Sequence, residues 1–101
     1  MAQARALLEA ELHVFLQSHK AWSFDSGALV RTYEASDFLM GIDFVQRVAK
    51  LAEAADHHPD IDIRWRNVRL RFTTHDAGNQ VTELDMRLAL ECDLLFDALL
   101  K

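Results

Sequence analysis

Residues 61–72 read IDIRWRNVRLRF, and apolar and polar side chains alternate along two runs of this stretch. A period of two is typical of strands that bury one face, and two residues between such runs are typical of a tight hairpin. The pattern therefore predicts two antiparallel strands joined at Arg66–Asn67. The expected facing pairs are Trp65 with Val68, Ile63 with Leu70, and Ile61 with Phe72.

Towards the N-terminus, a helix and a second hairpin are expected. An amphipathic helix over about the first eighteen residues is predicted by helical spacing of apolar side chains. Residues 22–24 and 29–33 are rich in strand-forming types and flank Asp25–Ser26–Gly27, so they predict two strands around a tight turn. The residues that carry the helical spacing are Leu8, Leu12, Phe15 and Leu16.

A second helix is expected between the two hairpins. Ser36 is its predicted N-cap, and Pro59 favours an extended conformation for His58, so the helix should end near Asp56 or His57. Its predicted apolar stripe consists of Phe38, Ile42, Val45, Ala49 and Ala52.

A third helix should follow the polar loop 76–80. Thr82–Glu83–Leu84–Asp85 fits a capping box, in which the acidic side chain returns to the N-cap amide. Residues 88–100 then carry apolar side chains around more than one face, which a small domain has no room to bury. We therefore expect part of this helix to contact another subunit.

Together these elements predict a single α+β domain over residues 1–101. The order is α-β-β-α-β-β-α, with an antiparallel four-stranded sheet and the helices on one face.

Composition narrows the class of function. The chain has 101 residues, a net charge of −5 at pH 7 and one cysteine, Cys92. Nucleic acids and anionic membranes are bound chiefly by Lys and Arg clusters, so neither is expected as a direct partner. A lone cysteine forms no disulfide within the chain, and no apolar run approaches the ~20 residues of a membrane span. A cytoplasmic protein is the expectation.

Three histidines, His57, His58 and His75, converge at the open end of the predicted 61–72 hairpin, where His58 is expected opposite His75. Imidazole donates or accepts a proton near neutral pH, so this cluster is a candidate for general acid–base catalysis. Each histidine alone is better explained as a solvated strand-end residue. His13 and His19 are expected on the surface.

Carboxylates and an aromatic residue surround this cluster in sequence. Glu53 precedes His57 by one helical turn and could orient its imidazole, although a solvated helix-end carboxylate fits equally. Asp85 is explained by the capping box with Thr82, and Trp65 is on pattern alone better explained as core than as a ligand platform.

A metal site is the weaker explanation of the histidines. His57 and His58 are neighbours in an extended segment, where successive side chains point to opposite faces. Asp85 or Glu53 could complete a ligand set, which would make the protein a metal-dependent hydrolase. We expect no metal and no cofactor.

From Glu53 onward the chain resembles the pterin-4a-carbinolamine dehydratase family. Its spacings agree with the family pattern of an acidic residue, His-His-Pro, an aromatic residue and a further histidine, and the resemblance reaches upstream to Trp22. Two departures are Trp65, where tyrosine is commoner, and the loop before Asp85, which is one residue longer than in many members. The matching positions are Glu53, His57–His58–Pro59, Trp65, His75 and Asp85.

The resemblance implies a lyase that dehydrates a 4a-hydroxy-tetrahydropterin to a quinonoid dihydropterin. The reaction would serve tetrahydrobiopterin recycling beside an aromatic amino acid hydroxylase. His57 and His75 would be the proton-transfer pair, with acid and base unassigned, and His58 would position the pterin. Substrate-binding or orienting groups would be Glu53, Trp65 and Asp85. Family members assemble as dimers or tetramers, so the resemblance implies a homodimer or homotetramer.

The alternative is an interaction or regulatory protein. Some family members look bifunctional, assisting dimerisation of a transcription factor or expression of a hydroxylase, and fold alone does not decide function. The intact set of three histidines favours an enzyme, because a pure adaptor has no physical need of it.

Overall fold

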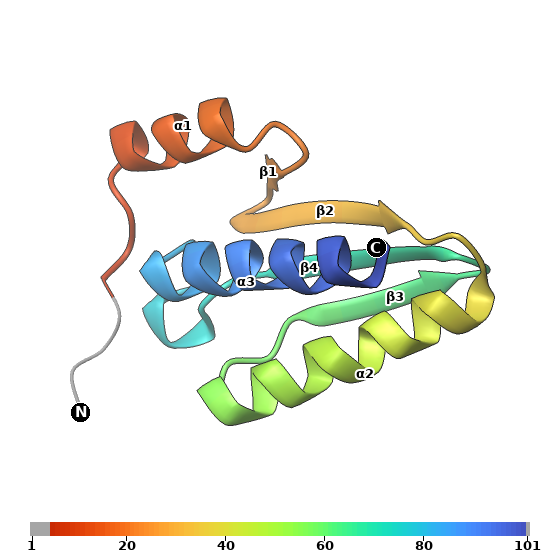
Figure 1. Cartoon of the computed structure of the whole chain (residues 1–101). Coiled ribbons are helices and arrows are strands. Elements are labelled where there is room, and N and C mark those ends of the chain that lie inside the picture. The colour runs from red at the N-terminus through yellow and green to blue at the C-terminus, as the bar shows by residue number, and fades with distance from the viewer. Residues whose placement is uncertain (1–4, 101) are drawn as a thin grey trace.

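Strands β3 (Asp60–Arg64) and β4 (Asn67–Phe72) form the hairpin that the alternating stretch predicts. In the structure, a computed structural model that describes residues 5–100, this hairpin belongs to a four-stranded antiparallel sheet. Strands β1 (Ser23–Asp25) and β2 (Ala28–Glu34) complete it in the order β1-β2-β4-β3 (Figure 1). The predicted element order and the α+β class are confirmed.

The predicted register of the β3–β4 hairpin is wrong by two residues. The turn is Trp65–Arg66, and Ile63 pairs with Val68. A shift of two keeps each side chain on its predicted face of the sheet. It nevertheless moves Trp65 out of the strand into the turn, where its φ is 53°. It also removes the predicted pairing of His58 with His75.

A contact from the end of β2 holds the turn in this register. The Ala35 amide donates to the Arg66 carbonyl oxygen at 2.9 Å, and the Arg66 guanidinium donates to the Ala35 carbonyl oxygen at 3.1 Å. The guanidinium also lies over the Trp65 ring, 4.8 Å from its centroid. Local alternation alone carries no information about this partner, which explains the error.

Helices α2 (Phe38–Ala55) and α3 (Glu83–Leu100) cover one face of the sheet (Figure 1). The N-cap of α2 is Asp37 rather than the predicted Ser36, and its carboxylate accepts a hydrogen bond from the Met40 amide at 2.7 Å. The helix ends as predicted, because Asp56 adopts the left-handed conformation at the C-cap.

The predicted apolar stripe of α2 is displaced around the helix. The fully buried positions are Gly41, Phe44, Val48 and Ala52, of which the prediction included only the last. Phe38, placed in the stripe, is 47% exposed. Apolar residues occupy both stripes, so packing against the sheet and α3 decides which one is buried.

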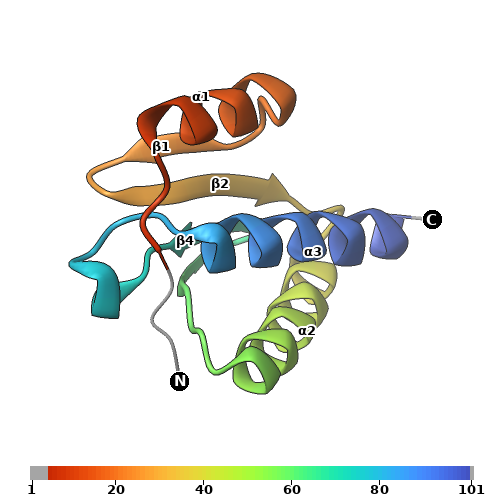
Figure 2. The same ribbon diagram turned by 90° about the vertical axis from the view of Figure 1, so that its left-hand side faces the viewer.

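Helix α1 (Glu9–Ser18) begins later than predicted, and residues 1–4 of the predicted helix lie outside the described residues. The Leu7 amide donates to the Val81 carbonyl oxygen at 2.9 Å, and Glu11 accepts from the Leu8 amide. The segment before α1 therefore runs in an extended conformation past the start of α3 (Figure 2).

The core lies between the sheet and the helices, and aromatic rings fill much of it. The rings of Tyr33, Phe44 and Phe96 pack with centroids 4.6–5.1 Å apart. Phe15 of α1 and Trp22 join the same cluster. Within residues 5–100, none of the helices combines the length and apolar character needed to cross a membrane.

Candidate active site

His57 lies where the chain turns from α2 into β3. The left-handed C-cap Asp56 reverses the chain, and the His57 amide closes the end of the helix by donating to the Ala52 carbonyl oxygen at 3.1 Å. The imidazole Nε2 is 2.6 Å from Asp85 Oδ1, and its ring stacks near Phe72. Only 10% of the His57 side chain is exposed, so this pair is shielded from water.

Asp85 is fully buried at the third position of α3 and uses both carboxylate oxygens. Its Oδ2 accepts from the Thr82 amide at 2.9 Å, while the Thr82 hydroxyl accepts from the Leu84 amide at 3.3 Å. This arrangement confirms the predicted capping box. Its Oδ1 meets His57, so the residue acts as a helix cap and as a partner of an imidazole at once.

His58 and Glu53 form a second pair, which corrects the expectation that Glu53 orients His57. Glu53 Oε1 lies 2.7 Å from His58 Nε2, and the two side chains are 81% and 55% exposed, respectively. The extended segment after Asp56 sends successive side chains in different directions, so the helix-end carboxylate meets the second histidine rather than the first.

His75 follows β4 and begins the short 3₁₀ helix η1 (His75–Ala77). Its Nδ1 lies 2.7 Å from Asn79 Oδ1, and both residues are exposed. Asn79 has a positive φ of 59°, a conformation that asparagine tolerates better than most residues. The extra loop residue noted in the sequence therefore falls beside the residue that orients this imidazole.

His57 and His75 are connected through one buried cluster. Asp85, the partner of His57, also accepts a hydrogen bond at 2.8 Å from Thr74, which immediately precedes His75. Each imidazole has one nitrogen next to an oxygen acceptor, which leaves Nδ1 of His57 and Nε2 of His75 to exchange protons.

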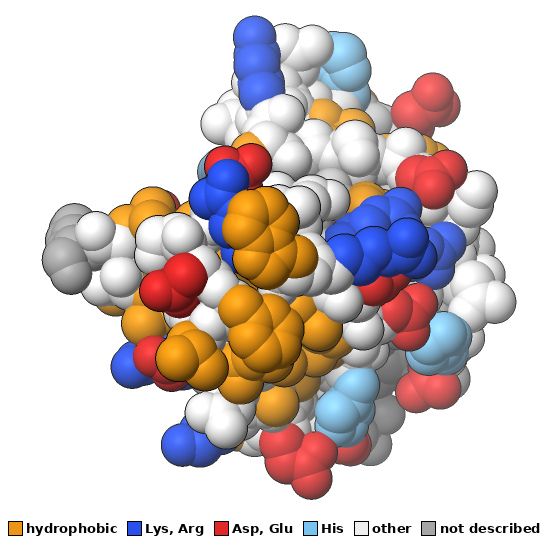
Figure 3. All heavy atoms as spheres, turned by 90° about the vertical axis from the view of Figure 1, so that its right-hand side faces the viewer, with side chains coloured by type: hydrophobic (Ala, Val, Ile, Leu, Met, Phe, Trp, Pro, Cys, Tyr) orange, Lys and Arg blue, Asp and Glu red, His pale blue; other side chains and the backbone are white. Residues whose placement is uncertain are grey.

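Trp65 is the one predicted site residue that the structure does not bring to the histidines. It occupies the β3–β4 turn, at the closed end of the hairpin, and is 69% exposed. Figure 3 shows hydrophobic side chains gathered on this side of the molecule, where the start of α2 contributes the exposed Phe38 and Leu39. A role for Trp65 in substrate binding stays a prediction.

Thr74 and Asn79 were not predicted from the sequence as site residues. The buried Thr74 stands at the end of an alternating strand, where its hydroxyl had no visible partner, and Asn79 was assigned only to a polar loop. The available signal for Asn79 was its position four residues after the candidate His75. Within residues 5–100, no three His, Cys, Asp or Glu side chains are grouped to hold a metal ion.

Comparison with known proteins gives a consistent result. Residues 5–95 match the family model described as pterin 4 alpha carbinolamine dehydratase. A protein of Chloroflexus aurantiacus provisionally named pterin-4-alpha-carbinolamine dehydratase is 51% identical over 87 residues, covering 86% of this chain and 92% of the relative. A Mycolicibacterium vanbaalenii protein with the same provisional name is 45% identical with the same coverage.

Solved structures agree with the sequence matches. A crystal structure from Brucella melitensis, described as a transcriptional coactivator/pterin dehydratase, superposes with a TM-score of 0.84 at 29% identity. The match covers 90% of this chain and 98% of the other. The chain therefore belongs to the pterin-4-alpha-carbinolamine dehydratase family.

Proposed function

We propose that this protein dehydrates a 4a-hydroxy-tetrahydropterin to the quinonoid dihydropterin and water, with histidines as general acid and base and without a metal. The observation that carries the proposal is the pair of imidazoles linked through Asp85 and Thr74, each with one nitrogen held by an oxygen acceptor. Such positioned groups typically contribute ~10²–10⁴-fold each to a rate.

The two imidazoles differ in a way that supports separate roles. His57 faces a buried carboxylate, whereas His75 faces a neutral amide. We assign His57 as the acid that protonates the 4a-hydroxyl, so that the C4a–O bond breaks and water leaves. His75 is the base that removes the N5 proton, and the released electron pair forms the C4a=N5 double bond. No net oxidation or reduction occurs.

His58 and Glu53 have a supporting role in this scheme. Both are exposed and joined at 2.7 Å, and we assign them to contact with the incoming pterin. The names of the relatives support a pterin substrate, and we place the reaction in tetrahydrobiopterin recycling after an aromatic amino acid hydroxylase. Cytoplasm remains the expected compartment.

A direct assay tests the activity. A chemically generated 4a-hydroxy-tetrahydropterin should disappear faster with the purified protein than in buffer, and a chelator should leave the rate unchanged. A rate equal to that in buffer would disprove the dehydratase proposal. Loss of activity on chelation would replace the metal-free mechanism with a metal-dependent one.

A regulatory role is the second candidate, favoured by the description of the Brucella melitensis structure as a transcriptional coactivator as well as a pterin dehydratase. A His57→Ala/His75→Ala double variant separates the two roles in a deletion strain of the source organism. A catalytic role is lost with both imidazoles, whereas a role in protein contact survives.

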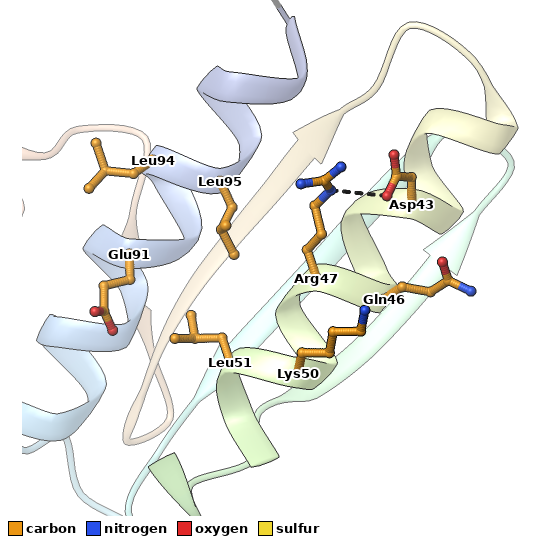
Figure 4. Close-up of a pocket in the computed structure, with 8 residues that line it drawn as sticks. All are labelled: Asp43, Gln46, Arg47, Lys50, Leu51, Glu91, Leu94 and Leu95. Atoms are coloured by element: carbon orange, nitrogen blue, oxygen red, sulfur yellow. Dashed lines mark hydrogen bonds and ion pairs between the residues drawn. The ribbon is translucent and has the colours of Figure 1, made fainter. Parts of the chain in front are cut away.

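We also propose that the chain associates with a second copy through α2 and α3. A hollow of 680 Å³ lies between these helices, with Leu51 and Leu95 on its two sides (Figure 4), and the adjoining Leu94 is 70% exposed. Arg47 borders it on α2 but already pairs with Asp43 at 3.0 Å, which leaves Lys50 on α2 and Glu91 on α3 as opposite charges that a two-fold contact can pair. His57, His58 and His75 do not line the hollow, so we treat it as an interface candidate rather than the pterin site.

Sedimentation at micromolar concentration tests this contact. The wild type should sediment as a dimer or larger, and Leu94→Asp should shift it towards monomer. The exposed Val14→Asp change on α1 is the matched control, because it adds the same charge outside the hollow. A monomeric wild type would contradict the proposal.

A further inference from the structure

Thr74 occupies the junction between β4 and the loop that carries His75. Its side chain is buried, with 6% of the residue exposed, and its hydroxyl oxygen lies 2.8 Å from Asp85 Oδ2 and 2.7 Å from the Thr82 hydroxyl oxygen. Thr82 is also fully buried. Both hydroxyls therefore have partners only inside the protein, and each has a single proton to donate.

The hydrogen bonds in this cluster all run towards Asp85. The Leu84 amide donates to the Thr82 hydroxyl at 3.3 Å. The Thr82 hydroxyl proton has two acceptors within reach, Thr74 at 2.7 Å and Asp85 Oδ2 at 3.5 Å, and we assign it to the shorter contact with Thr74. The Thr74 proton then donates to Asp85 Oδ2, which also accepts from the Thr82 amide. A carboxyl group that accepts at Oδ2 from two donors is held as an acceptor, so its Oδ1 receives the Nε2 proton of His57.

The backbone of Thr74 holds the other imidazole. Its amide donates to the Gln80 carbonyl oxygen at 3.0 Å, and its carbonyl oxygen accepts from the Ala77 and Asn79 amides at 3.2 and 3.1 Å. These hydrogen bonds join the two ends of the loop at Thr74 and Gln80 and fix the start of η1. They also place Asn79, whose side-chain oxygen meets His75 Nδ1.

We propose that Thr74 is a positioning residue shared by the two imidazoles. Its hydroxyl keeps the Asp85 carboxylate in the acceptor state that fixes the Nε2–H form of His57, and its backbone fixes the loop that aims His75. The inference deepens the proposed dehydratase and rests on it for its kinetic consequence. The hydrogen-bond polarity at His57 is independent of any substrate.

The test compares variants that differ by one hydroxyl. Thr74→Val removes the hydroxyl at nearly constant volume, and Thr74→Ser restores it. Thr73→Val is the matched control, because Thr73 is equally buried but its hydroxyl donates to the Gly27 carbonyl oxygen at 2.8 Å, away from Asp85. Thr74→Ala replaces Thr74→Val if the valine variant does not fold, as judged by circular dichroism.

Two readouts are required. In nitrogen-edited proton spectra, the wild type, Thr74→Ser and Thr73→Val should show the His57 Nε2–H signal, assigned by its absence in His57→Gln, and Thr74→Val should lose it to exchange with water. In the dehydration assay, kcat of Thr74→Val should fall about 10- to 100-fold with little change in KM. In metalloproteins, losing the hydrogen-bond partner that orients a metal-ligating imidazole has an effect of this size, and we use it as the scale here. Thr74→Ser should recover most of it.

The outcomes separate this inference from the proposed function. If Thr74→Val keeps the N–H signal, or if its kcat equals that of Thr73→Val, Thr74 is not a positioning residue. If no variant and not even the wild type dehydrates the pterin, the proposed function fails, and the N–H signal alone then decides whether Thr74 sets the state of His57.

Discussion

His57 and His58 are consecutive residues with nearly identical carboxylate contacts, yet their surroundings are opposite. His57 lies 2.6 Å from an Asp85 carboxylate with no exposed surface, and His58 lies 2.7 Å from a Glu53 carboxylate that is 81% exposed. Coulombic attraction between charges at such distances is weak beside water and much stronger where water is excluded. Burial, rather than distance, therefore makes the first pair the candidate for chemistry.

The largest expected effect is the loss of an imidazole. His57→Ala and His75→Ala should each lower kcat by about 10²–10⁴-fold, the usual contribution of a positioned acid or base. His13→Ala, an exposed change on α1, should stay near the wild-type rate with the same fold. Steady-state rates together with circular dichroism check this. Comparable turnover in all three variants would contradict the assignment of His57 and His75 as the proton-transfer pair.

Asp85 tests whether its two hydrogen-bonding roles can be separated. Thr82→Ala removes one half of the capping box and should lower stability by about 1 kcal/mol, the scale of a lost helix cap. Asp85→Ala removes the other half and also leaves the buried Thr74 hydroxyl without its acceptor, so its loss of stability should be larger. Asp85→Ala alone also deprives His57 of its carboxylate, so turnover should fall strongly only in that variant. Melting curves and rates at a temperature where both are folded decide. Matching losses in both measurements would make Asp85 a cap only.

Burial should also control the titration of the single cysteine, Cys92. It raises the pKa of the Cys92 thiol to about 12, whereas an unfolded thiol titrates near ~8.5. Above pH ~8.5 the unfolded state loses this proton first, so stability should fall as pH rises towards 12. Between pH 7 and 10 the wild type should lose about 1–2 kcal/mol more than Cys92→Ala in urea unfolding. Equal losses in both proteins would contradict this account of the thiol.

The smallest effect is expected at the exposed pair. Glu53→Gln keeps a hydrogen-bond acceptor beside His58 and removes only a solvent-screened charge. Stability should change by less than about 0.5 kcal/mol, and kcat by no more than a few-fold. A loss of kcat as large as that of Asp85→Ala would show that exposure does not distinguish the two histidine pairs, and the comparison would have to be abandoned.

Alternation and spacing were sufficient to predict the order of the elements, the two hairpins and the end of α2. These features depend on side-chain periodicity and on Pro59, which act within a few residues along the chain. The candidate histidines could be identified for the same reason. Each precedes β3 or follows β4, so any hairpin of that stretch brings them to one end of the sheet.

Only the tertiary structure decided which side chains meet. Ala35 fixes the hairpin turn and thereby places Trp65 away from the histidines, and packing selects the buried stripe of α2. The contacts of Asp85 with His57 and Thr74 span 28 and 11 residues of sequence. Such contacts depend on how the layers stack, which local periodicity does not encode. The sequence therefore determined which residues could do chemistry, and the packing of α3 against the end of the sheet decided which of them are held together.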